Sequence, residues 1–149
     1  MSSHARRCIH AIGIAASLSL LHPAHAADAQ FFSTLDPAPM TLATRGDVAG
    51  TGSITAELTG DRLTVQGSFS GLASPATKAQ LRSGSMTGVP GDAFADLTVS
   101  PAESGTLSGA LTLRPVQRKA LLGGAIYVQI DSVKAPDGTL RAWLLSRQP

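Results

Sequence analysis

The sequence predicts an all-β protein, an antiparallel β-sandwich of Greek-key type with about eight short strands and one short helix near residues 115–122. Apolar and polar residues alternate with a period of two in several segments, which is typical of strands with one buried face. Clusters of Gly, Pro and Asp separate these segments, as the turns of an antiparallel sheet require. No repeat, phosphate-binding Gly-rich loop or dividing linker interrupts the pattern, so we expect one domain over residues 27–149.

Residues 1–26 have the layout of a secretory signal peptide. Arg6 and Arg7 precede an apolar run over residues 9–21, which is too short for a membrane-spanning helix of about 20 residues. A small-x-small cleavage pattern closes the segment at Ala26. We therefore expect export to the periplasm or the cell exterior, cleavage near Ala26, and no membrane insertion of the mature chain. The alternative is a surface amphipathic helix.

Loss of this segment would remove whole classes of chemistry. It contains the only cysteine, Cys8, and all four histidines, at positions 4, 10, 22 and 25. Without Cys or His, the remaining chain cannot build an ordinary zinc or copper site or a nucleophile–histidine pair. We therefore expect no metal and no other cofactor. Of the 12 Lys and Arg residues, Arg6 and Arg7 lie in this segment, so ten remain against ten acidic residues. This near-neutral charge gives no support for a nucleic-acid partner.

The first half of the remaining chain predicts a strand and then a hairpin. Residues 31–35 form a first strand that ends at Asp36-Pro37. Residues 53–58 alternate with apolar side chains on one face, and residues 63–69 repeat this pattern after the tight turn at Gly60-Asp61. We expect these two strands to pair with each other.

The second half predicts further strands around one helix. The strands before the helix are expected at residues 77–82, 92–100 and 107–113. Pro115 suits the first turn of a helix and Gly123-Gly124 suits its end. A closing pair of strands follows at residues 122–132 and 135–145, joined by a proline-led turn. Residues 83–91 contain three glycines and are expected to form a mobile loop.

Six segments of the chain, taken in order, resemble the CHRD domain, a module repeated in animal chordin and also present alone in exported bacterial proteins. The segments are Phe32-Ser33-Thr34-Leu35, Gly50-Thr51-Gly52-Ser53-Ile54-Thr55-Ala56, Leu63 to Leu72, Ser104 to Gly109, Leu121 to Val128, and Pro136 to Arg141. The resemblance covers nearly all of the mature chain. It implies an all-β sandwich and agrees with the alternation described above.

Three positions depart from the family pattern. Where the resemblance implies histidines, this chain has Gln80, Arg82 and Asp131. If the family fold holds, these positions meet on two neighbouring strands. We therefore hypothesise that an ion pair between Arg82 and Asp131, flanked by Gln80, replaces a histidine cluster. The alternative is that all three side chains are solvated and contribute little.

Three aromatic residues fall on the polar faces of their predicted strands. They are Phe94, Tyr127 and Trp143, and Arg141 shares the face of Trp143. Exposed aromatics beside arginine are typical of binding anchors. The alternative is that loops, the short helix or local twist bury them.

The sequence therefore predicts a non-enzymatic, exported binding or structural module that recognises an unidentified protein partner. Asp92 and Asp96 lie roughly 13 Å apart if extended, which is too far for a pair of catalytic carboxylates. The alternative function is a small-ligand or metal-binding accessory protein whose histidine site has been lost or replaced at Gln80, Arg82 and Asp131. The oligomeric state is not predicted.

Overall fold

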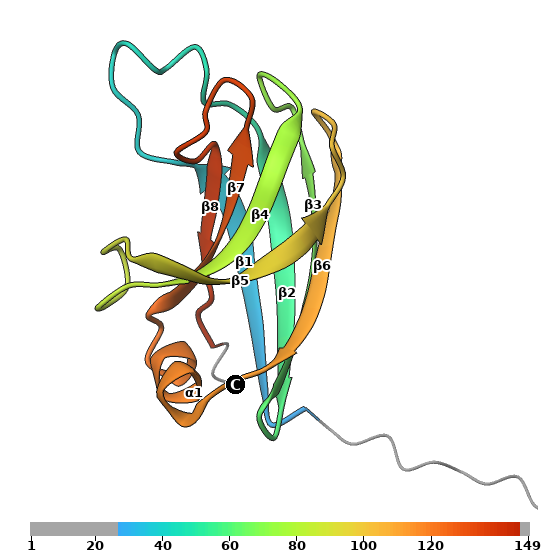
Figure 1. Cartoon of the computed structure of the whole chain (residues 1–149), viewed down its shortest axis with the longest axis vertical. Coiled ribbons are helices and arrows are strands. Elements are labelled where there is room, and N and C mark those ends of the chain that lie inside the picture. Colours follow the sequence, from blue (N-terminus) through green and yellow to red (C-terminus); the bar gives the residue numbers. More distant parts are fainter. Residues whose placement is uncertain (1–26, 147–149) are drawn as a thin grey trace, which may run out of the picture.

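The computed structural model of the protein describes residues 27–146, which form a closed barrel of eight antiparallel strands (Figure 1). The strands are β1 (Ala29–Pro37), β2 (Thr51–Thr59), β3 (Arg62–Ser70), β4 (Ala76–Ser83), β5 (Asp92–Val99), β6 (Gly105–Thr112), β7 (Ile126–Ser132) and β8 (Leu140–Trp143). One helix, α1 (Pro115–Leu122), lies between β6 and β7. The all-β, antiparallel class and the short helix are confirmed.

The predicted sandwich is wrong, because the sheet closes on itself. Its order around the barrel is β1-β2-β3-β6-β5-β4-β7-β8, and β1 also pairs with β8, with Asp36 opposite Arg141. Closure leaves no free strand edge at this seam. A sandwich and a barrel both place every second residue inside, so alternation along the sequence does not distinguish them.

The order of the strands brings distant parts of the chain together. β3 pairs with β6, and β4 pairs with β7, so the chain crosses between non-neighbouring strands in the manner of a Greek key. The predicted hairpin of β2 and β3 is present, with Ala56 opposite Val65. The consequence for function is that β4, β7 and β8 form one continuous wall, as seen in Figure 1.

Most of the apolar residues that alternation placed on the inner face fill the barrel interior, but Ala93 on β5, predicted to face inward, is exposed beside a shift in strand register. Ile54, Leu63, Leu81 and Ile130 each come from a different strand and are completely buried. Burial of such a side chain contributes roughly 1.5–3 kcal/mol relative to leaving it exposed. These four side chains therefore offer no hydrogen-bonding group to the barrel interior.

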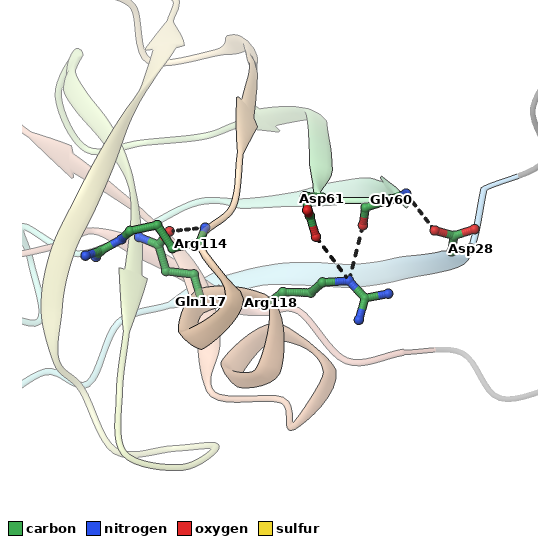
Figure 2. A network of polar contacts seen from close by, with 6 residues as sticks. All are labelled: Asp28, Gly60, Asp61, Arg114, Gln117 and Arg118. Atoms are coloured by element: carbon green, nitrogen blue, oxygen red, sulfur yellow. Dashed lines mark hydrogen bonds and ion pairs between the residues drawn. The ribbon is translucent and has the colours of Figure 1, made fainter.

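Helix α1 is fastened to the turn between β2 and β3 (Figure 2). The Nε of Arg118 donates to the carbonyl oxygen of Gly60 at 3.2 Å and lies 3.7 Å from a carboxylate oxygen of Asp61. At the start of the helix, the backbone N–H of Arg114 donates to Oε1 of Gln117 at 2.8 Å. Leu121 is fully buried. The helix therefore spans the predicted residues and packs on the barrel through Leu121 and the partly buried Ala120.

The predicted signal peptide, residues 1–26, lies outside the described residues. Within residues 27–146, α1 is the only α-helix, and no helix there has the length and apolar character needed to cross a membrane.

Candidate binding site on the barrel wall

β7 is buried on both of its faces, unlike the other strands. All seven of its residues are buried, including the outward-facing Tyr127, Gln129 and Asp131, with exposed fractions of 0%, 5% and 6%. Loops cover this outer face. The loop over residues 38–50 is joined to Thr139, whose carbonyl oxygen accepts from the N–H of Ala38 at 3.0 Å. The outer face of β7 is therefore a buried, polar layer outside the apolar interior of the barrel.

One polar cluster on this face holds the loop between β4 and β5 in place. The hydroxyl of Tyr127 accepts from Nε of Arg82 and from the N–H of Gly91, and it lies within donating distance of the Gly91 carbonyl, each at 3.1 Å. Arg82 also donates to Oε1 of Gln80 at 3.3 Å, and Gln80 donates to Asp96 at 2.8 Å. These contacts fix the loop end at Gly91 against β7.

A second cluster links β7 to β8. The Nε2 of Gln129 donates to Oδ1 of Asp131 at 2.8 Å and to the carbonyl oxygen of Asp137 at 3.3 Å. Nη2 of Arg141 donates to Oε1 of Gln129 at 2.9 Å. A Cβ at Gly138 would lie 3.0 Å from Cδ of Gln129, and Gly138 has a positive φ of 122°. Glycine therefore leaves room here for the buried amide.

The hypothesised ion pair between Arg82 and Asp131 is wrong. Strand register places Tyr127 opposite Arg82 and Lys78 opposite Asp131. The two residues are therefore offset by four positions, roughly 13 Å along the strands. Gln80 and Arg82 do lie together, but Asp131 belongs to the other cluster. The expectation that these side chains are fully solvated is also wrong for Asp131, which is buried.

The predicted aromatic anchors are mostly covered. Tyr127 is completely buried, and its ring centroid lies 4.5 Å from that of Trp143, at an interplanar angle of 40°. Trp143 is half-buried beside Gly84. Phe94 is the extra residue of a β-bulge, since Leu81 pairs with Ala95 and Arg82 with Ala93. The bulge breaks the alternation and lets Phe94 pack against the core.

Arg141 is the predicted surface residue that reaches an open site. It is half-buried, and its Cζ lies 5.1 Å from the Tyr127 ring centroid. Beside it is a cleft of about 320 Å³, here called the outer cleft. The cleft is lined by Ala38, Pro39, Thr44, Asp47, Val48, Pro90, Lys134, Ala135, Pro136, Asp137, Gly138 and Arg141.

Loops supply every residue of the outer cleft except Arg141, which lies on β8. They are the loop after β1, the loop between β4 and β5, and the turn between β7 and β8. In Figure 1 the first two project from the side of the barrel that carries β7 and β8. Sequence reasoning missed the loop residues, including Asp47 and Lys134. Their turn-rich composition indicated loops but gave no sign of where the loops would lie.

The outer cleft combines charged side chains of both signs with apolar proline, alanine and valine side chains. Lys134 and Asp137 are exposed, while Asp47 is half-buried. Among residues 27–146, no three His, Cys, Asp or Glu side chains lie close enough together to hold a metal ion. The arrangement can contribute hydrogen bonds, charge and apolar contact to a bound molecule.

Comparisons with known proteins agree with the resemblance in the sequence. The family model of the CHRD domain matches residues 31–144, from the first strand through β8. No curated protein and no solved structure gives a match.

Proposed function

The chain belongs to the CHRD domain family, and we propose that it acts after export as a non-catalytic module that recognises a protein partner through the outer cleft. Family membership indicates a binding or structural role. The outer cleft carries the proposal, because it combines loop walls with an arginine held on a rigid strand. Binding residues are commonly placed on loops over such a scaffold.

A comparison of the two outer walls of the barrel favours the side with the outer cleft, and not the side with β2 and β3, as the partner-binding surface. On β2 and β3 the outward residues Glu57 and Gln66 are exposed. On the cleft side, proline side chains at positions 39, 90 and 136 supply apolar surface, with Lys134 and Asp137 at the rim. Apolar surface rimmed by charge is typical of recognition sites.

Site-directed photo-cross-linking in the producing cells tests the protein-recognition function. A photoreactive amino acid would replace Asp137 in one variant and Glu57 in the other, both exposed carboxylates. We expect a discrete adduct from position 137 and none from position 57. Equal adducts from both positions, or none from position 137, would contradict the proposal.

A charge reversal sharpens the same experiment. Lys134→Glu is expected to reduce the yield of the adduct several-fold, because rim charges steer association. Lys119→Glu on α1, an exposed lysine outside the outer cleft, serves as the matched control and should leave the yield unchanged.

Export is tested separately. The mass of the protein isolated from the periplasm or medium is expected to correspond to a chain that begins at Ala27. A full-length chain confined to the cytoplasm would contradict export.

A second candidate function is binding of a small ligand. Arg141 favours it, since this residue lines a cleft of about 320 Å³, a volume at the lower end of the usual range of small-molecule sites. The metal-binding form of this candidate has less support, because Gln80, Arg82 and Asp131 hydrogen-bond to neighbouring side chains.

A further inference from the structure

Arg141 has a buried donor that lacks an acceptor. Its Nη2 donates to Gln129, but its Nε is buried and has no hydrogen-bond partner in the structure. Within residues 27–146, the one ion pair closer than 4.0 Å joins Arg118 to Asp61, so no carboxylate neutralises Arg141 at that distance. A buried polar group without a partner is costly, and charged groups more so. Arg141 as a whole is only half-buried and lines the outer cleft, so an acceptor from outside the chain can approach its guanidinium from the cleft.

The neighbours of Arg141 hold its guanidinium in position. The amide nitrogen of Gln129 already donates to Asp131 and to the carbonyl of Asp137. This fixes the amide orientation and directs its oxygen at Arg141. The Tyr127 ring lies 5.1 Å from the guanidinium carbon. An arginine ordered in this way loses less conformational entropy when it binds.

The charges of the outer cleft narrow the chemistry of the acceptor. A carboxylate matches the planar guanidinium and can accept two parallel hydrogen bonds. Asp47 and Asp137 line the same cleft beside a single lysine, Lys134, and they would repel a doubly charged anion such as phosphate more strongly than a singly charged one. Their carboxylates can instead accept N–H donors. A molecule with one carboxylate, at least one amide N–H and some apolar surface therefore matches the residues of the cleft.

We propose that Arg141 is the anchor for a carboxylate of this kind in the outer cleft. The group is either the carboxylate of a peptide chain or that of a free organic acid. The inference rests on the proposed function, since it places recognition in the same cleft, but it concerns the chemistry and not the size of the ligand.

Nuclear magnetic resonance of the ¹⁵N-labelled protein tests the anchor. N-acetylglycine is the probe, and its neutral analogue N-acetylglycinamide is the matched control. We expect N-acetylglycine to shift the Nε–H signal of Arg141 saturably, with the amide and inorganic phosphate binding at least about tenfold more weakly. Equal binding of acid and amide, or tighter binding of phosphate, would overturn the proposal.

Substitution of the anchor provides the second arm. Arg141→Lys retains the charge but loses the planar fork, so its affinity for N-acetylglycine should fall about tenfold or more. Arg62→Lys on the exposed wall of β3 is the control and should bind as the unaltered protein does. Unchanged binding by Arg141→Lys would overturn the proposal. The acid–amide comparison uses the unaltered protein, so it decides the matter even if Arg141→Lys does not fold.

A third arm distinguishes the two sources of the carboxylate. Tripeptides with a free or an amidated C-terminus are compared with N-acetylglycine. Tighter binding of the free-ended tripeptide supports the anchor with a peptide as its ligand. Equal affinity of that tripeptide and N-acetylglycine supports the anchor with a small organic acid as its ligand. This outcome would contradict the proposed recognition of a protein partner but not the carboxylate anchor.

Discussion

The outer faces of β3 and β7 have similar polar sequences but different environments. Thr64, Gln66 and Ser68 on β3 face solvent wholly or in part, whereas Gln129 and Asp131 on β7 are buried. The strands themselves do not account for this difference, since both alternate in the same way. The loops do, because those that follow β1, β4 and β7 line the outer cleft beside β7. Whether an outward-facing polar residue of this barrel is buried therefore depends on the loops that cover its strand.

The largest expected loss of stability comes from interior substitutions, and it should be similar on the β3 wall and the β7 wall. Ile130→Ala on β7 and Leu63→Ala on β3 remove completely buried interior side chains. Each should lower the free energy of unfolding by about 2–5 kcal/mol, through lost burial and an unfilled cavity. Urea denaturation measures both. A much smaller loss of unfolding free energy for one of the two variants would show that β3 and β7 do not contribute equally to the packing of the barrel interior.

The next effect should separate the walls clearly. Gln129→Ala removes an amide that bridges Asp131 and Arg141, so it should cost about 1–3 kcal/mol. Gln66→Ala, the matched change on β3, should stay within about 0.5 kcal/mol because its side chain is exposed. The same urea titrations apply to both variants. Equal costs would mean that burial of the outer face of β7 has no energetic consequence.

The smallest effect concerns the loop between β4 and β5. Tyr127→Phe removes a hydroxyl that hydrogen-bonds to Arg82 and Gly91, and it should cost about 0.5–1.5 kcal/mol. Amide hydrogen exchange at residues 84–91 should accelerate, since this cluster fixes the loop end. Thr64→Ala on the opposite wall is the control and should leave that exchange unchanged.

The elements of the fold could be predicted from the sequence to a large extent. Alternation located the strands, and Pro115 with Gly123 bounded the helix at the residues where it occurs. Both signals depend on local geometry, with a side-chain period of two in strands and fixed backbone preferences at helix ends. The family resemblance depended on the same local segments, and the CHRD match over residues 31–144 confirms it.

The predicted candidate site was only partly correct, for reasons of register and coverage. Arg82 and Asp131 do lie on neighbouring strands, but their pairing depended on a register that alternation leaves open to any even shift. Phe94 was assigned to the outer face because an unrecognised bulge interrupts the alternation. Tyr127 was assigned correctly to the outer face, but loops distant in sequence bury it there.

The sequence by itself determined the all-β class, the strand and helix positions and the family, because each depends on patterns within a few residues. Tertiary structure alone decided that the sheet closes into a barrel and that loops from three parts of the chain meet beside β8. It also decided which arginine would have a buried donor without an acceptor. These outcomes depend on contacts between residues far apart in the chain, where local sequence patterns carry little information.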